Sequence, residues 1–182
     1  IYELICSGNY LGHDSLNRGV KYPEMEKRVK ELFPGDGHQI ICSRFRYAIE
    51  GDSHLTYIHS DAKDINAGYH ILVYLTKDAP VDDGIVFYEH STKGLYGDMT
   101  NIQETENFKV FEPVYIVPYV YNRAVILDYA YFHSPMLHTG FGEDIASSRL
   151  MHIIEIANID SSQYEYRMSF PGTCVSTCDD PN

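Results

Sequence analysis

The stretch GYHILVYLTKDAPVDDGIVFYE, residues 68–89, decides the expected fold. Two short runs rich in aliphatic and aromatic residues, Gly68–Thr76 and Gly84–Glu89, flank a segment that contains Pro80 and three Asp. Aromatic and β-branched residues favour strands, whereas Pro and Asp favour turns. This stretch therefore predicts two strands joined by a turn-rich connection.

The same alternation of apolar runs and turn residues continues along most of the chain. Short strands at regular spacing predict an all-β sandwich or barrel, and a two-sheet jelly roll (a cupin-like double-stranded β-helix) would manage the sheet edges. No repeats or low-complexity linkers occur, which predicts a single domain over residues 1–182 with a core at about 39–157. The other predicted strands are Gln39–Ile49, Leu55–His59, Pro113–Pro118, Arg123–Ala130 and Ser148–Ala157.

One amphipathic helix is predicted to flank this core. Pro23 stands at a first-turn position, where no backbone N–H donor is needed, and Pro34-Gly35 ends the helix. Between them, apolar residues recur at helical spacing and form one stripe that would cover a sheet. They are Met25, Val29, Leu32 and Phe33. The longest irregular segment, His90–Glu112, is expected to be a surface loop that contributes to substrate specificity.

Composition limits the classes of partner. The 182 residues carry a formal net charge of −12, and Lys and Arg are scattered, so a nucleic-acid partner is not expected. No apolar run approaches the roughly 18 residues of a membrane span, and a cytoplasmic protein is expected. The first residue, Ile1, indicates a processed or truncated start, which leaves an earlier targeting segment open. Cys6, Cys42, Cys174 and Cys178 are too sparse for a disulfide scaffold, and reduced thiols are expected.

His59-Ser60-Asp61 is the strongest candidate for chemistry. Because side chains alternate across a strand, the imidazole and the carboxylate of His-x-Asp point the same way. One more imidazole from a distant strand, for which His133 is the candidate, would complete one face of a metal ion. Such a 2-His-1-carboxylate face with open positions suits non-haem Fe(II) that activates dioxygen. In a chain with 9 His and 26 acidic residues the two-residue motif arises about once by chance, so it needs support from its context.

Further residues follow this motif in an ordered series. They are Tyr74-Leu75-Thr76, Asp83-Gly84 before Ile85-Val86-Phe87-Tyr88, Asn122-Arg123 before Ala124-Val125-Ile126-Leu127, His133-Ser134-Pro135 and Arg149-Leu150. This succession resembles the Fe(II)/2-oxoglutarate-dependent dioxygenases, particularly prolyl-hydroxylase-like members, over roughly residues 39–157. The sequence departs from the family pattern at Asp83, where the family has the first of two Gly, and at Thr76, where it has Asn.

The resemblance implies that the two histidines and Asp61 bind Fe(II). It also implies that Arg149 binds the distal carboxylate of 2-oxoglutarate, because a guanidinium grips a carboxylate with two parallel hydrogen bonds. Tyr74 and Tyr47 are the further co-substrate contacts that it suggests. O2 is the other co-substrate, and ascorbate is allowed as an accessory. The implied activity is hydroxylation of an unactivated C–H bond, with release of succinate and CO2. Asp61 favours hydroxylation because related halogenases have a small residue there.

The distal ligand has an alternative. His138 lies 11 residues before Arg149, and the gap from His133 to Arg149 is longer than in the most compact family members. His133 is favoured because it directly follows a hydrophobic strand, whereas His138 is expected in an inserted loop. The remaining histidines are expected to be ordinary hydrogen-bonding residues, and His152 should face away from Arg149. They are His13, His38, His54, His70, His90 and His152.

A non-catalytic jelly-roll or cupin-like binding module is the alternative to an enzyme. Cupin metal sites commonly use His-x-His, which does not occur in this sequence. The expected substrate is a small molecule or a residue in a peptide, with no role for nucleic acid or membrane. The sequence does not determine the substrate or the oligomeric state.

Overall fold

A computed structural model describes residues 23–34, 37–51, 58–62, 68–97, 107–136 and 140–158. These ranges contain the helices α2 (Pro23–Leu32) and α3 (Asn107–Val110). Their strands are β1 (His38–Ala48), β2 (Gly68–Tyr74), β3 (Gly84–His90), β4 (Phe111–Pro118), β5 (Ala124–Asp128), β6 (His133–Pro135) and β7 (Arg149–Asn158).

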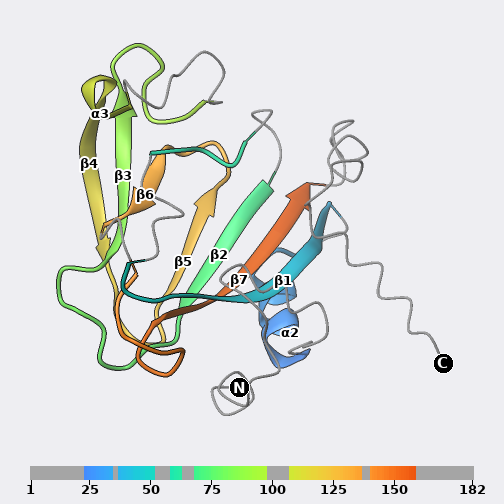
Figure 1. Cartoon of the computed structure of the whole chain (residues 1–182). Coiled ribbons are helices and arrows are strands. Elements are labelled where there is room, and N and C mark those ends of the chain that lie inside the picture. Colours follow the sequence, from blue (N-terminus) through green and yellow to red (C-terminus); the bar gives the residue numbers. More distant parts are fainter. Residues whose placement is uncertain are drawn as a thin grey trace.

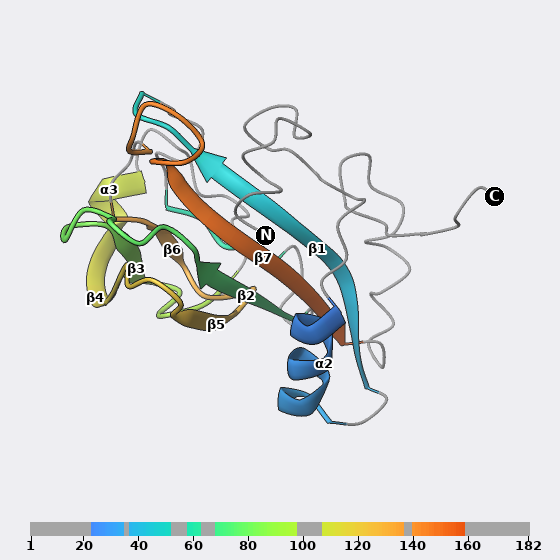
Figure 2. The same cartoon turned by 90° about the horizontal axis from the view of Figure 1, so that it is seen from below.

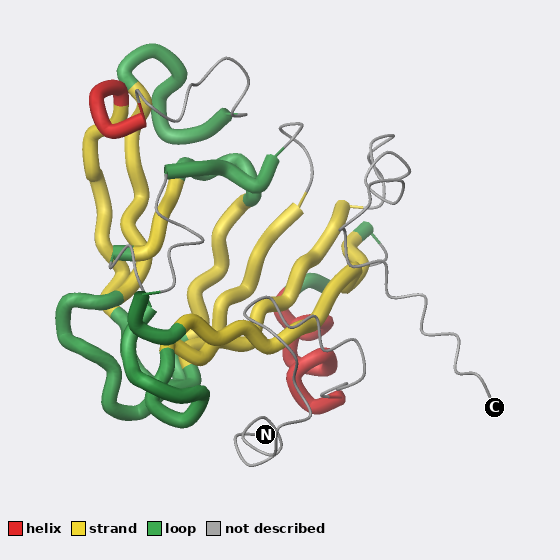
Figure 3. Tube along the Cα trace, viewed as in Figure 1, coloured by secondary structure: helices red, strands yellow, loops and turns green. Residues whose placement is uncertain are grey.

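The strands form two antiparallel sheets that face each other (Figure 1; strands are yellow in Figure 3). One sheet has the order β1-β7-β2-β5 and the other β4-β3-β6. From β4 onward the chain crosses to the opposite sheet with each new strand, and the first strand pairs with the last. This winding is that of a jelly roll, or double-stranded β-helix, so the predicted fold class is confirmed.

Helix α2 covers the outer face of the four-stranded sheet, beside the end of β7 (Figure 2). Its only fully buried residue among those described, Val29, is part of a core cluster with residues of β2 and β7. These partners are Ile71, Val73, Ile154 and Ile156. Met25, Val29 and Phe33 of the predicted apolar stripe therefore pack against the sheet, whereas the prediction was wrong for Leu32, which is 61% exposed.

A second cluster fills the space between the sheets. Its buried members come from β2, β3, β5 and the segment after β4, and they are Tyr74, Ile85, Tyr119, Val125 and Leu127. Because strand side chains alternate, residues an even number of positions from Tyr74 along β2, His70 among them, share this inner face. Residues that pair directly across neighbouring strands lie on the same face, so the register of β2 with β7 places Glu155 and Met151 on the inner face as well.

Hydroxyl groups tie the ends of β2 and β7 together. The Tyr119 hydroxyl accepts hydrogen bonds from the backbone N–H groups of Leu75 (3.1 Å) and Thr76 (3.0 Å) and lies 2.5 Å from the Leu150 carbonyl oxygen. Thr76 Oγ1 donates to the Ser148 carbonyl and accepts from the Leu150 N–H. Thr76 thus has a structural role in this network.

The structure differs from the predicted elements mainly at their ends. β6 has only three residues and is too short for a period-two pattern to reveal it. Of the predicted strand Leu55–His59, residues 55–57 lie outside the described residues, and His59 forms an isolated antiparallel bridge with His133. The short helix α3 lies within the predicted loop His90–Glu112.

Gly84 fixes where β3 begins. Its φ is +154°, and a Cβ atom at this position would lie 2.2 Å from the backbone oxygen of Val117 on the paired strand. Only glycine fits such a close approach of two backbones.

No helix in the described ranges is long and apolar enough to cross a membrane.

Candidate metal centre

His59, Asp61 and His133 converge at one point in the structure. One ligand atom from each lies within 4.8 Å of the other two. Asp61 Oδ2 is 3.5 Å from His133 Nε2, and Asp61 Oδ1 is 4.0 Å from His59 Nε2. Ligand atoms on one face of a first-row metal ion lie about 3 Å apart when each bond is about 2.1 Å long. Small side-chain adjustments would therefore suffice to close these atoms around an ion.

Backbone hydrogen bonds hold the three residues in place. His59 and His133 exchange both backbone N–H···O bonds, at 3.0 and 2.8 Å. The Asp61 N–H donates to the carbonyl of Tyr129 at 2.9 Å. Ser60, between His59 and Asp61, points away from them and donates to the Gly97 carbonyl at 2.7 Å. This alternation is the one that the His-x-Asp spacing predicts.

The His133 ring is oriented by its second nitrogen. His133 Nδ1 lies 2.9 Å from the carbonyl oxygen of Tyr131, so Nδ1–H donates there and Nε2 faces Asp61. Metal-binding histidines commonly have such a partner, which fixes both the tautomer and the ring orientation. Its neighbour Phe87, with ring centroids 6.5 Å apart, adds an apolar wall.

The protonation states suit a cation. Burial and the nearby His59 lower the pKa of His133 to about 4, so its ring is neutral at pH 7. Burial alone would raise the pKa of Asp61, but His70, His133 and His59 outweigh burial and hold that pKa well below its usual range. Neutral imidazole and ionised carboxylate are the forms that bind metal. The donor set therefore fits Fe(II) in type and charge.

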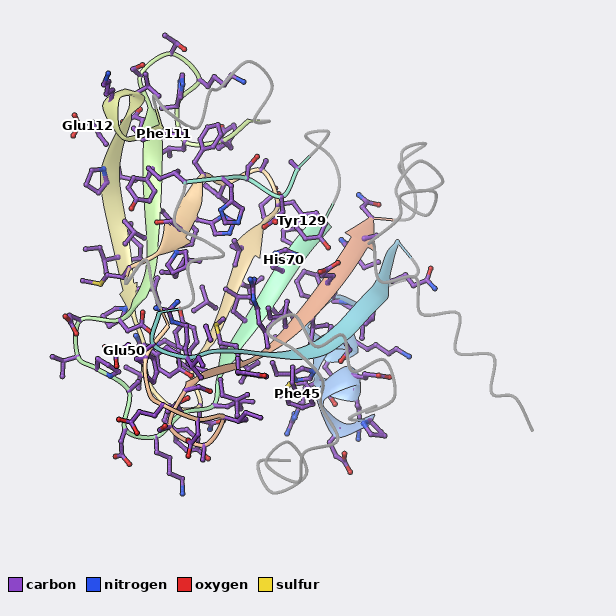
Figure 4. All side chains as sticks on the ribbon, viewed as in Figure 1. Phe45, Glu50, His70, Phe111, Glu112 and Tyr129 are labelled. Atoms are coloured by element: carbon purple, nitrogen blue, oxygen red, sulfur yellow. The ribbon has the colours of Figure 1, made fainter. Side chains whose placement is uncertain are left out.

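His70 is a hydrogen-bonding histidine, as expected, and its partner Asp61 belongs to the candidate centre. Its Nδ1 lies 3.1 Å from Asp61 Oδ2, and its Nε2 lies 3.6 Å from Glu155 Oε1. Tyr129 packs edge-on against the His70 ring, with ring centroids 4.4 Å apart. Both residues are labelled in Figure 4. Burial would lower the pKa of His70, but the two carboxylates outweigh it and raise the pKa to about 9. His70 thus holds the outer oxygen of Asp61.

Arg149 and Asp83 form a buried ion pair. Arg149 Nε donates to Asp83 Oδ2 at 2.9 Å, and Nη2 donates to Asp83 Oδ1 at 2.8 Å. Arg149 is 5% exposed and Asp83 is fully buried. The guanidinium fork that the resemblance assigned to the distal carboxylate of 2-oxoglutarate is therefore held by a carboxylate of the protein itself. This arrangement does not fit a second carboxylate in the same place.

Tyr74 and Tyr47 lie on different faces of the sheet. Tyr74 is on the inner face, 1% exposed, and its hydroxyl has no hydrogen-bond partner among the described residues. Tyr47 is paired with Leu150 in the register of β1 and β7, and it packs with that residue and Phe45. Since Leu150 and Arg149 face opposite ways on β7, Tyr47 is on the outer face, and the structure does not bring it to the site.

The other sequence candidates fall outside the centre or outside the described residues. His138, Cys6, Cys174 and Cys178 lie outside the described residues, and so do residues 98–106 of the predicted loop His90–Glu112. His152 is on the outer face, as expected, where it contacts Ser43 Oγ at 2.8 Å and stacks on Phe45. Burial lowers the pKa of His152 to about 4.

No protein-family model and no curated protein matches the sequence. A solved structure titled non-heme monooxygenase, ThoJ in its apo form, is 13% identical with a TM-score of 0.43 over 75% of this chain and 52% of that one. The non-heme alpha-ketoglutarate-dependent carbocyclase SnoK from nogalamycin biosynthesis is 13% identical with a TM-score of 0.45, over 75% of this chain and 58% of that one. This chain thus spans only a little more than half of either protein.

Proposed function

We propose that this chain is a non-haem Fe(II) oxygenase that consumes a 2-oxo acid and hydroxylates an unactivated C–H bond. 2-Oxoglutarate is the 2-oxo acid that the sequence resemblance implies. Within that family, this sequence most resembles the prolyl-hydroxylase-like members. The proposed substrate is a small molecule or a residue in a peptide. The observation that carries the proposal is the convergence of His59, Asp61 and His133 within 4.8 Å.

The protein residues have separable roles in this proposal. His59, Asp61 and His133 would hold the iron on one face, which leaves the opposite face for the 2-oxo acid and O2. Iron with these co-substrates supplies an oxidative decarboxylation that leaves one oxygen atom for the substrate C–H bond. His70 keeps the Asp61 carboxylate in position, because its Nδ1 lies 3.1 Å from Oδ2.

Aromatic side chains favour an apolar substrate group beside the centre. The ring centroid of Phe87 lies 6.5 Å from that of His133, and Tyr131 packs against Phe87 at 6.0 Å. Tyr96 follows at 5.8 Å from Tyr131, and these two tyrosines are 56% and 37% exposed. Ring faces and edges attract apolar groups and tolerate polar ones at their rim. A C–H-rich group would therefore be held near the metal.

The test is Fe(II)-dependent turnover of the 2-oxo acid. Purified protein, reconstituted with Fe(II) under anaerobic conditions, is given saturating 2-oxoglutarate and then O2, and succinate is measured. We expect slow succinate formation without substrate in the wild type and none in Asp61→Ala. Asp82→Ala, the same change at an exposed carboxylate, should retain the wild-type rate. The absence of Fe(II)-dependent succinate formation from the wild type would exclude 2-oxoglutarate as the co-substrate, and the additional absence of Fe(II)-dependent decarboxylation of 2-oxovalerate would exclude the proposed function.

A further inference from the structure

The inner face of the large sheet carries a second polar group, the Arg149–Asp83 pair, away from His59, Asp61 and His133. Tyr74 lies four residues after His70 on β2, about 13 Å along the strand at 3.3 Å per residue. Arg149 lies on the same face of β7 as Glu155, the partner of His70. The face that holds the metal residues thus continues to the Arg149–Asp83 pair.

Asp83 is built into this position. Its side chain is fully buried, and its backbone N–H donates to the Pro80 carbonyl at 3.1 Å. Its carbonyl accepts from the Tyr119 N–H at 2.7 Å, and the backbone of the next residue, Gly84, is fixed by its close approach to β4. The backbone on both sides of Asp83 is therefore fixed, and its buried carboxylate already occupies the Arg149 guanidinium with two hydrogen bonds.

The pair leaves one donor unused. The Tyr74 hydroxyl is buried and has no hydrogen-bond partner in the described part of the chain. Burial raises the pKa of Tyr74, and Asp83 raises it further, so the hydroxyl stays a neutral donor. The Tyr74 ring stacks on that of Tyr119 with centroids 4.1 Å apart, and the Tyr119 N–H donates to the Asp83 carbonyl, so Tyr74 lies in the same region as the pair.

We infer that Asp83 determines co-substrate selectivity. Because this carboxylate of the protein itself neutralises Arg149, the site favours a 2-oxo acid whose distal end is uncharged. The inference rests on the proposed function and concerns only the end of the co-substrate that does not contact the metal. A second carboxylate beside Asp83 would place two like charges next to the same buried guanidinium. An uncharged end avoids that repulsion, and a hydrogen-bond acceptor on it could use the Tyr74 hydroxyl.

The experiment compares two acids that differ only at that end. 2-Oxoglutarate and 2-oxovalerate have the same number of carbon atoms, and the second has a methyl group in place of the distal carboxylate. Each is titrated by calorimetry into protein loaded with Mn(II), which binds the same ligand types as Fe(II) without consuming the acid. The readout is the ratio of the two dissociation constants in the wild type, in Asp83→Asn and in the control Asp82→Asn.

We expect 2-oxovalerate to bind the wild type and Asp82→Asn at least as tightly as 2-oxoglutarate does. Asp83→Asn keeps the shape of the side chain but removes its charge, so the preference should move toward 2-oxoglutarate by at least about tenfold. If Asp83→Asn does not fold, the wild-type ratio alone decides. A wild type that prefers 2-oxoglutarate tenfold, or a folded Asp83→Asn with an unchanged ratio, overturns the inference and leaves the proposed function intact. Binding of neither acid overturns both.

Discussion

Removing the Asp83 carboxylate should destabilise the protein strongly. In Asp83→Ala the Arg149 guanidinium, 5% exposed, loses both hydrogen bonds of its bidentate pair and stays buried without that counter-charge. Breaking a buried pair from one side costs about 3–5 kcal/mol. This is a large part of the roughly 5–15 kcal/mol by which a native protein is stable.

Urea unfolding measures this loss of stability. The transition midpoint should shift, and an unchanged slope shows that both proteins expose the same amount of surface when they unfold. Asp82→Ala is the matched control, and its exposed carboxylate should be worth less than about 0.5 kcal/mol. The double variant Asp83→Leu/Arg149→Met should recover most of the loss, since apolar groups of similar volume can replace a buried ion pair. A single variant Asp83→Ala within about 1 kcal/mol of the wild type would refute the reasoning, because the pair would then not be buried as described.

Three further predictions test the packing around the site. The pKa of His152 is lowered to about 4 in the folded state, so the free energy of unfolding is highest above pH 6.5 and decreases as the pH falls toward 4. Between pH 7 and pH 5 this free energy should decrease by about 2 kcal/mol more in the wild type than in His152→Leu, as measured by urea unfolding at each pH. Tyr119→Phe leaves the buried Thr76 N–H without its acceptor and should lower the free energy of unfolding by about 2–4 kcal/mol. The control Tyr121→Phe, at an exposed position, should lower it by less than about 0.5 kcal/mol, and equal urea midpoints for the two variants would contradict the prediction. Gly84→Ala meets the backbone of β4 at 2.2 Å and should lower the thermal midpoint far more than Gly94→Ala, where φ is +78° and no atom lies within 4 Å.

The sequence predicted the parts of the site that depend on local geometry. His59 and Asp61 share a face because strand side chains alternate, and Ser60 points the other way. The jelly-roll class followed from the spacing of short apolar runs. The placement of His133 depended on the hydrophobic strand that precedes it.

Contacts between distant strands could not be predicted in the same way. Asp83 and Arg149 are 66 positions apart, and only the pairing of strands brings them together. His70 faces Asp61 and Glu155 for the same reason. The resemblance suggested Tyr47 as a co-substrate contact, but the register with β7 turns this side chain to the outer face. Residue spacing along the chain does not give the register in which two strands pair. A shift of one residue in that register moves every side chain of the strand to the opposite face of the sheet.

The most direct test of the metal centre is a binding titration with Mn(II) or, without oxygen, Fe(II). The wild type should bind one ion per chain, and His59→Ala, Asp61→Ala and His133→Ala should each lose it while remaining folded by circular dichroism. His138→Ala should bind as the wild type does. Stoichiometric binding that survives in His133→Ala and disappears in His138→Ala, or a wild type that binds no ion, would contradict the account.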